Sequence, residues 1–174
     1  MKSMITALIL TFTVACSSLP PTSSRLSLTQ IDSLNLMNLN TVTAKKELGA
    51  PDIKDYTDSS HQEETWLYLA GEPTTTRLSL IFNAATGNII SAHWFMDDRE
   101  PESELNRLIK RYPKASFDIK NPTKKESIYG PSLFYQSSTT PLTIIVDERT
   151  NSVSAMSWTA NPSLTPSGRK PTSH

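Results

Sequence analysis

The strongest constraint on the fold is a pattern of eighteen residues that occurs at residues 78–95 and again, 64 positions later, at residues 142–159. In each copy an alternating apolar run leads into a short turn sequence, and a second apolar run follows it. Alternation with a period of two residues is typical of a half-buried β-strand, so each copy is predicted to be a β-hairpin. Four positions are identical in the two copies: Leu78 and Leu142, Ile81 and Ile145, Thr86 and Thr150, and Trp94 and Trp158.

The two predicted turns share their chemistry. Asn83 of the first copy falls on Asp147 of the second, and either side chain can accept hydrogen bonds from the backbone of the turn. Gly87 falls on Asn151, and these two residue types tolerate a positive φ best. Two unrelated hairpins with common turn residues would give a similar pattern. We interpret the match as a tandem repeat.

The N-terminus has the features of an export signal. Lys2 precedes an apolar run over residues 4–14, which is too short to cross a bilayer but has the length of the apolar region of a signal peptide. The run ends at Thr13-Val14-Ala15-Cys16, which resembles the lipobox of bacterial lipoproteins. This resemblance implies cleavage before Cys16 and lipid attachment to its thiol; a buried free thiol is the alternative. Ser17, by the lipoprotein sorting rule of Gram-negative bacteria, implies anchoring in the outer membrane on its periplasmic side.

Charge and cysteine content exclude several classes of function. The chain has 17 Lys and Arg, 17 Asp and Glu, and a single cysteine. No basic excess is present to hold a phosphate backbone, so nucleic acid is not an expected partner. With Cys16 lipidated, no disulfide forms and soft-metal sites are not expected. The sequence has no phosphate loop, nucleophile elbow or zinc-binding helix motif, and we expect neither a cofactor nor catalysis.

The chain divides into five predicted segments. Residues 1–15 form the signal peptide, and residues 16–27 form a tether rich in Pro and Ser. Residues 28–97 and 98–159 form the two repeats, and residues 160–174, rich in Pro, Ser and Thr, form a disordered tail. A three-stranded sheet has a marginal core by itself. We therefore predict an α+β fold in which two tandem α-β-β-β units form one antiparallel sheet with helices packed on one face.

Each repeat is predicted to begin with helices and to continue into strands. In the first repeat we expect a helix at 28–39, a helix at 41–48 that Gly49 and Pro51 end, a polar loop at 52–65, and a strand at 66–69. In the second repeat, acidic residues and Pro at 98–102 favour a helix start. The other elements expected there are a short strand at 117–119, a charged loop at 121–127 and a strand at 133–135.

Alternation assigns the strand residues to two faces of the sheet. The face toward the helices is predicted to carry Leu67, Leu78, Leu80, Phe82, Ile90, Ala92, Trp94, Leu133, Leu142, Ile144, Val146, Met156 and Trp158. The opposite face is predicted to carry Trp66, Tyr68, His93, Phe95 and Phe134. Large aromatic side chains often anchor binding, so this second set is the candidate partner-binding surface. The alternative is that loops or the C-terminal tail cover it.

The first repeat also resembles a known family. Leu39 to Asp52, with its Leu-Gly-Ala-Pro ending, then Trp66-Leu67-Tyr68, then 78–82 and 87–90, resembles the SmpA/OmlA family of small outer-membrane lipoproteins, which includes the BamE subunit of the β-barrel assembly machinery. The match covers residues 28–96. A tandem α-β-β-β arrangement is similar to the β-lactamase inhibitor protein fold, in which a concave sheet grips a partner. Both resemblances imply binding rather than catalysis.

Three functions follow as hypotheses. The first is a lipid-anchored binding or scaffold subunit with an envelope protein as its partner. The resemblance implies a role for this subunit in outer-membrane protein assembly or envelope integrity. The second is an inhibitor-like or ligand-binding lipoprotein that uses the same sheet face. The third is an enzyme built on His93 with Asp97 and Asp98; we favour instead a surface histidine beside acidic residues that cap a helix.

Overall fold

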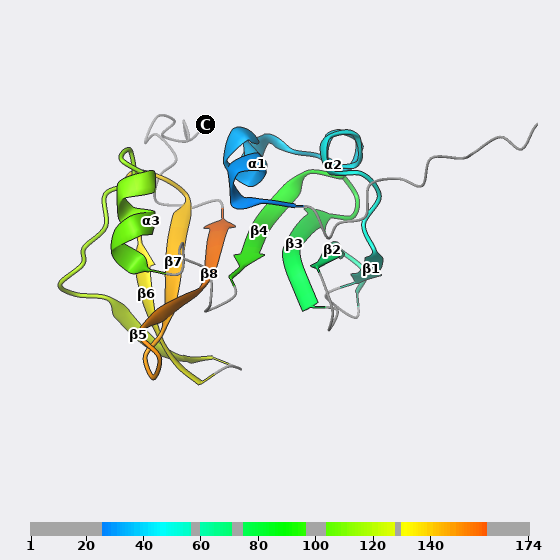
Figure 1. Ribbon diagram of the computed structural model, residues 1–174. Helices are drawn as coiled ribbons and strands as arrows, with labels where there is room; N and C mark the ends of the chain where they lie inside the picture. Colours follow the sequence, from blue (N-terminus) through cyan, green and yellow to red (C-terminus); the bar gives the residue numbers. More distant parts are fainter. Residues whose placement is uncertain (1–25, 57–59, 71–74, 97–103, 128–129, 160–174) are drawn as a thin grey trace, which may run out of the picture.

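The computed structural model describes residues 26–56, 60–70, 75–96, 104–127 and 130–159. These residues form one eight-stranded antiparallel sheet in the order β1-β2-β3-β4-β8-β7-β6-β5, with three short α-helices and one 3-10 helix (Figure 1). The helices are α1 (Leu28–Ser33), η2 (Leu36–Asn38), α2 (Thr41–Leu48) and α3 (Leu105–Arg111). The strands are β1 (Ile53–Tyr56), β2 (Glu63–Ala70), β3 (Thr75–Asn83), β4 (Ile89–Phe95), β5 (Thr123–Ser127), β6 (Gly130–Gln136), β7 (Leu142–Asp147) and β8 (Ser152–Thr159).

The two predicted hairpins are β3–β4 and β7–β8, and their turns are built alike. Asn83 Oδ1 accepts the backbone N–H of Thr86 at 2.9 Å, and Asp147 Oδ1 accepts that of Arg149 at 2.8 Å. Gly87 (φ 68°) and Asn151 (φ 55°) have the positive φ that their residue types tolerate. The chain therefore reverses at both places through side-chain oxygens that bond the turn backbone.

Helices α1 and α2 begin after residues whose side chains accept their free N–H groups, Ser27 and Asn40. Asn40 caps α2, because its Oδ1 accepts the backbone N–H of Thr43 at 2.9 Å while the Thr43 hydroxyl accepts the N–H of Asn40. Gly49, with φ 84°, ends α2. The N-terminus of α2 is also bonded to the β3–β4 turn, since Thr41 N–H donates to the Gly87 carbonyl at 2.9 Å.

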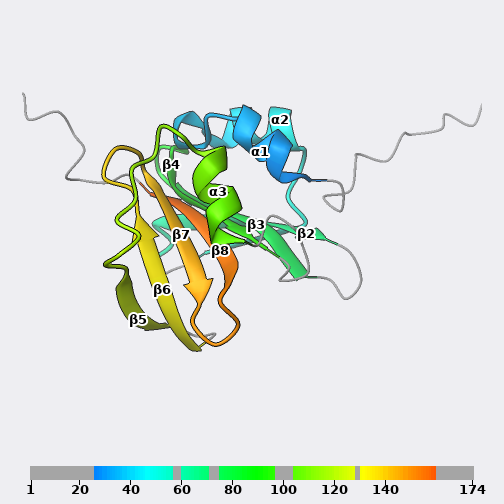
Figure 2. The same cartoon turned by 60° about the vertical axis from the view of Figure 1, so that its left-hand side comes forward.

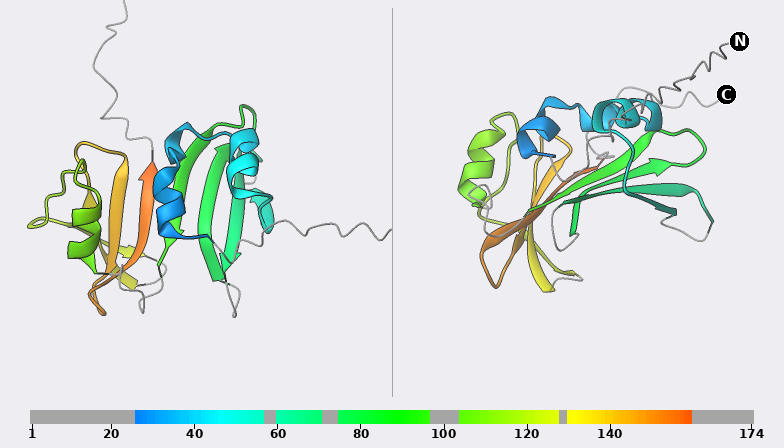
Figure 3. Two further views of the ribbon diagram at one scale, coloured as in Figure 1. Left: turned by 45° about the horizontal axis from the view of Figure 1, so that its top comes forward. Right: turned by 45° about the vertical axis from the view of Figure 1, so that its right-hand side comes forward.

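All four helical segments pack on one face of the sheet. Figure 3 shows α2 over β2 and β3, α1 over the middle of the sheet, and α3 over the strands of the second hairpin. The core between the two layers contains Ile31 and Leu48 from the helices and Leu78, Phe82 and Ile144 from the strands. Burying these apolar side chains is the main stabilisation of the sheet.

An ion pair joins the two helical regions on this face. Arg111, at the end of α3, places Nε 2.5 Å from Asp32 Oδ2 in α1, and its Nη2 donates to the Thr29 hydroxyl at 3.1 Å. The Tyr112 hydroxyl donates to the other oxygen of Asp32. Figure 2 shows α3 in front of β7 and β8 with α1 above it. The contact links segments about 80 residues apart, since Asp32 and Tyr112 are separated by 80 positions.

The structure corrects several expectations about individual elements. Residues 52–65 are not only loop: β1 and the start of β2 lie there, and β5 lies in the predicted charged loop 121–127. Four strands therefore follow the helices in each half instead of three. Both missed strands are sheet edges with exposed residues, and neither Ile-Lys-Asp-Tyr nor Thr-Lys-Lys-Glu-Ser has an alternating apolar pattern.

Two further elements also differ. The helix predicted at 28–39 is broken into α1 and η2, because the backbone of Leu34 is extended (φ −90°, ψ 136°). The strand predicted at 117–119 is reduced to one bridge between Phe117 and Ser137. The helix start predicted at 98–102 lies outside the described residues, as do the signal peptide, the tether up to residue 25 and the C-terminal tail.

Candidate functional site

The candidate binding surface is the face of the sheet opposite the helices, called the far face below. Small side chains occupy its centre, because β4 and β8 pair there and place His93 opposite Ser157. Ser79 pairs with His93 on one side, and Thr143 pairs with Ser157 on the other. Ser79 and Ser157 are buried although they face away from the core. The middle of the far face is thus a row of hydroxyl groups around one imidazole.

A second row on the far face is apolar. Phe95 pairs with Ala155, Ala155 pairs with Ile145, and Ile145 pairs with Phe134. Cross-strand partners lie on the same face of a sheet, so β4, β8, β7 and β6 together present these four side chains side by side. Phe95, Ile145 and Phe134 are partly exposed. The structure therefore brings two of the predicted site residues, Phe95 and Phe134, into one apolar row.

The positions predicted for Trp66 and Tyr68 were wrong. Both lie on the helix face, because Trp66 pairs with Leu80 and Tyr68 with Leu78, and these leucines point into the core. Trp66 is 2% exposed and Tyr68 is fully buried. Leu67, predicted to face the helices, lies on the far face opposite Ser79. Every residue from 66 to 69 is apolar or aromatic, so alternation alone does not decide the phase.

The two core aromatics have specific polar partners. The Trp66 indole N–H donates to Glu64 Oε1 at 2.8 Å, and its ring centroid lies 5.0 Å from that of Phe82. The Tyr68 hydroxyl donates to the carbonyl of Gly49 at 3.3 Å. Burial, with a smaller contribution from Asp52, raises the pKa of Tyr68 above its ordinary value. These contacts make Trp66 and Tyr68 residues of the core and not of the far face.

His93 is held as a neutral side chain at the centre of the far face. Burial lowers its pKa below the ordinary value of a histidine. Its Nε2 lies 3.3 Å from the Ser91 hydroxyl, which is on the same strand two residues earlier. This geometry suits hydrogen bonding to a polar group of a partner. Among the described residues, no group of three or more His, Cys, Asp or Glu side chains is arranged to hold a metal ion; Asp97 and Asp98 lie outside them.

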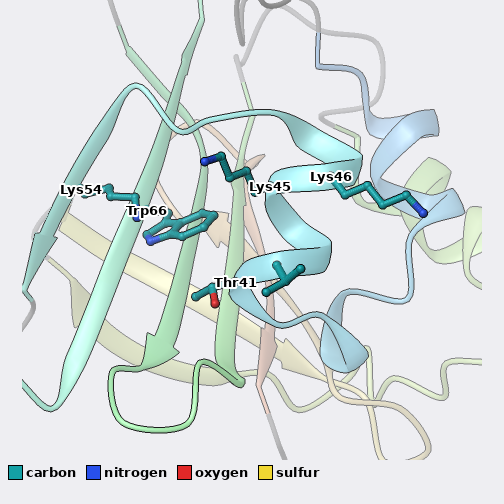
Figure 4. Close-up of a pocket in the computed structure, with 6 residues that line it drawn as sticks. Thr41, Lys45, Lys46, Lys54 and Trp66 are labelled. Atoms are coloured by element: carbon teal, nitrogen blue, oxygen red, sulfur yellow. The ribbon is translucent and has the colours of Figure 1, made fainter.

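The structure also contains a pocket that sequence reasoning missed. It has a volume of about 490 Å³, opens between α2 and the edge of the sheet, and is lined by Thr41, Val42, Lys45, Lys46, Lys54 and Trp66. Figure 4 shows Lys45 and Lys54 on either side of the Trp66 indole, whereas Lys46 points away from it. Lys54 belongs to strand β1, which was not predicted, so its position beside α2 was not expected.

Lys54 is the most constrained cation of this pocket. Its Nζ lies 4.2 Å from the centre of the Trp66 ring and 3.1 Å from Glu64 Oε1. Burial is the largest single effect on the pKa of Glu64 and raises it, but the hydrogen bonds from Trp66 and Lys54 and the charge of Lys54 together outweigh burial and lower that pKa. A cation over an indole face is attracted by the ring quadrupole. The lysine is thereby fixed at the rim of the pocket with its ammonium group half exposed.

Comparisons with known proteins identify no family and no function for this chain. No protein-family model matches the chain, and no curated protein matches it. A search of solved structures finds the crystal structure of an extracellular protein containing a SCP domain from Bacillus anthracis str. Ames. The identity is 14% and the TM-score 0.42, over 75% of this chain and 46% of that protein. The chain thus spans less than half of that protein's length, and no functional conclusion follows from the likeness.

Membrane attachment through a helix is not seen in the described part of the chain. None of the helices there is long and apolar enough to cross a bilayer. The predicted attachment residue, Cys16, lies outside the described residues. Its lipidation therefore remains a prediction from the sequence.

Proposed function

We propose that this protein is a lipoprotein anchored in the outer membrane through Cys16, facing the periplasm, and that it acts as a non-catalytic binding or scaffold subunit for an envelope protein. The anchor rests on the lipobox-like sequence before Cys16. The binding role is supported by the resemblance of residues 28–96 to SmpA/OmlA lipoproteins. A contribution to outer-membrane protein assembly or envelope integrity is the function that this resemblance implies.

The observation that carries the binding role is the apolar row on the far face. Phe95, Ala155, Ile145 and Phe134 lie next to one another on four adjacent strands, and no helix of the described chain covers them. Exposed aromatic and aliphatic side chains that adjoin one another are the usual anchors of a protein interface. The neighbouring row of Ser and Thr hydroxyls with His93 supplies hydrogen-bonding groups beside the anchors.

In this proposal the sheet is built from two copies of one unit, each consisting of helical segments followed by four strands. The pairing of β4 with β8 supports duplication, because Trp94 lies opposite Met156 and Ala92 opposite Trp158. Trp94 and Trp158 are equivalent in the repeat, so exchanging the two strands leaves the register unchanged. Both hairpins also have a register shift at equivalent places, after Ile81 and after Ile145.

The register also changes which residues are equivalent in β2 and β6. Tyr135 lies opposite Ile144 as Trp66 lies opposite Leu80, so Tyr135 takes the place of Trp66. Phe134 then corresponds to Thr65, and Phe95 of the first unit corresponds to Thr159, so neither aromatic anchor has an aromatic equivalent in the other unit. A partner is expected to contact the two units unequally.

Substitution of Phe134 tests the proposed surface. Phe134→Ala is expected to weaken capture of the partner about ten-fold or more, since truncating an interface anchor commonly has effects of this size. The partner is first identified by cross-linking in intact cells followed by mass spectrometry, and capture is then measured with purified proteins. Ile119→Ala is the control, because Ile119 is an apolar residue with 50% exposure that lies between α3 and β5, outside the row.

The outcome also separates the two binding hypotheses. Co-purification of a barrel-assembly protein whose capture Phe134→Ala weakens supports the scaffold role. A periplasmic enzyme or an apolar ligand bound at the same row supports the inhibitor-like or ligand-binding alternative. Equal capture by Phe134→Ala, Ile119→Ala and the unmodified protein contradicts the assignment of the far face.

Lipid attachment is tested separately from the surface. Labelled palmitate is expected to enter the unmodified protein, and Cys16→Ser is expected to abolish the label and release the protein from the outer-membrane fraction. A single acyl chain gives marginal binding, whereas several chains give stable anchoring. Label that persists in Cys16→Ser, or that never enters the unmodified protein, contradicts the anchor.

A further inference from the structure

Strand β1 is an edge of the sheet with unusual surroundings. Among the described strands it pairs with β2 alone, and all four of its residues, Ile53 to Tyr56, are exposed. Four large hydrophobic side chains are exposed in the described part of the chain, and three of them lie at this edge or on the facing helix: Val42, Ile53 and Tyr56. An exposed apolar edge strand is a template for pairing with another chain.

The backbone of β1 has groups directed away from the sheet. Tyr56 N–H donates to Asp55 Oδ1 at 2.7 Å. The Leu67 carbonyl of β2 accepts Asp52 N–H at 2.9 Å, so the backbone groups of Leu67 face β1 and meet those of its partner Ile53, whereas those of Tyr56 point away from β2. Residues two apart in an antiparallel strand direct their hydrogen-bonding groups to the same side. The backbone groups of Lys54 therefore point outward as those of Tyr56 do. An added strand can therefore pair with the outward-facing backbone groups of Lys54 and Tyr56. The Tyr56 N–H is bonded to the exposed carboxylate of Asp55, which the added strand would replace.

The opposite edge of the sheet is different. β5 has the sequence Thr-Lys-Lys-Glu-Ser, and Lys124 is bonded to Glu148 of the β7–β8 turn at 2.6 Å. Charged side chains on an edge strand discourage pairing. The strand contains no large apolar residue. Of the two edges, β1 is the one with apolar neighbours and an adjoining pocket.

The positive charges around the pocket favour an acidic peptide as the strand that pairs with β1. The side chains of Lys54 and Tyr56 lie on the helix face, since they pair with Trp66 and Glu64. Lys45 of α2 adds a second ammonium group at the pocket, and it is exposed. Ile53 and Asp55 lie on the far face. A peptide with acidic side chains toward the helix face and apolar side chains toward Ile53 would match both sides.

We propose that the β1 edge and the adjoining pocket bind an extended acidic peptide segment of a protein partner, which adds to the sheet as a ninth strand. Backbone hydrogen bonds to Lys54 and Tyr56 provide the pairing. Glutamate or aspartate side chains of the peptide reach Lys54 and Lys45, and alternate apolar side chains cover Ile53. Main-chain pairing gives affinity and alternate side chains give specificity in this mode of recognition. The site is separate from the apolar row of Phe95, Ala155, Ile145 and Phe134 and does not depend on the role proposed for that row.

The test uses the full-length protein and synthetic peptides of eight residues that alternate valine and glutamate. Binding is followed by fluorescence anisotropy of the labelled peptide, and the site is located by hydrogen exchange of the β1 amides. The peptide is expected to bind and to slow exchange at Lys54 and Tyr56. A valine–lysine peptide, and a valine–glutamate peptide with a central proline, are expected to bind at least about ten-fold more weakly.

Variants of the protein distinguish strand addition from simple charge attraction. Lys54→Glu is expected to weaken the valine–glutamate peptide about ten-fold or more, whereas Lys110→Glu on α3, which makes the same charge change, is expected to leave it unchanged. Tyr56→Pro removes an N–H that β2 does not use, so the β1–β2 pairing is retained while the outer edge is blocked. Circular dichroism checks that each variant is folded.

Three results overturn the proposal. The first is the absence of binding of the valine–glutamate peptide at millimolar concentration. The second is equal binding of the proline-containing peptide, which would show charge attraction without strand pairing. The third is binding that Lys54→Glu and Lys110→Glu weaken equally, or exchange protection that appears on β5 instead of β1.

Discussion

Trp94→Ala is expected to lower the free energy of unfolding by about 3–5 kcal/mol, the range for a fully buried large aromatic residue. Trp94 is fully buried at the middle of the sheet, where β4 meets β8 and where η2 packs on both strands. Its ring also lies 4.5 Å from the Arg77 guanidinium carbon, and Arg77 donates to the Phe95 carbonyl at 3.1 Å. The substitution removes the contacts that the Trp94 side chain makes where the two halves of the sheet meet.

The chain provides its own control for this prediction. Trp158 is equivalent to Trp94 in the repeat, but it is only partly buried and packs at the border of the core. Trp158→Ala is therefore expected to cost about half as much. Trp94→Phe is expected to cost less than Trp94→Ala, since the Trp94 indole N–H has no hydrogen-bond partner in the described structure.

Urea unfolding of the three variants and the unmodified protein measures these differences. The curves are followed by far-UV circular dichroism, because substitution of a tryptophan changes the fluorescence signal. Equal losses for Trp94→Ala and Trp158→Ala would contradict the packing described for β4. A loss below about 1 kcal/mol for Trp94→Ala would contradict the burial of that side chain.

Stability is also expected to fall steeply above pH 10. The pKa values of Tyr68 and Tyr112 are both raised, mainly by burial; a smaller effect comes from Asp52 for Tyr68, and for Tyr112 from its hydrogen bond to Asp32. Above pH 10 the unfolded chain releases these phenolic protons while the folded protein keeps them. The unfolded state therefore gains free energy of ionisation, and the stabilisation that is complete below pH 10 is lost as pH rises. The slope is about 1.4 kcal/mol per pH unit for each tyrosine that stays protonated.

Tyrosine-to-phenylalanine variants isolate this effect. Tyr68→Phe is expected to reduce the fall of the unfolding free energy with pH by the contribution of one tyrosine. The variant also loses the hydrogen bond to the Gly49 carbonyl. Tyr112→Phe is expected to do the same and to lose the bond to Asp32. Urea unfolding between pH 8 and the alkaline limit gives the slope, and absorbance of phenolate reports which tyrosines titrate late. Tyr56→Phe, at an exposed tyrosine, is the control. An unchanged slope in both core variants would refute the prediction.

The predictable part of the site was the part with clear alternation. The strands β3, β4, β7 and β8 have small or polar residues between apolar ones, so the faces of His93 and Phe95 followed from the sequence and agree with the structure. Phe134 was also placed correctly. Trp66 and Tyr68 were assigned to the wrong face, because residues 66–69 include no polar residue that shows which face is exposed. The pairing of β2 with β3 determines their face.

The pocket beside α2 could not be predicted from the sequence, for a different reason. Its residues come from α2, β1 and β2, and Lys54 enters only because β1 pairs with β2 in the register that puts Lys54 opposite Trp66. An edge strand of four exposed residues has no hydrophobic period. Neither the strand nor the neighbourhood of Lys45 and Lys54 could therefore be inferred.

The sequence by itself determined the two hairpins, their turns and the helix that Asn40 begins and Gly49 ends, because each depends on residues close together in the chain. The tertiary structure alone decided that β4 and β8 meet at the centre, that Trp94 is buried more deeply than Trp158, and that β1 and β5 become the edges. These features depend on backbone pairing between distant segments. The side chains of one segment do not specify that pairing until the partner strand is present.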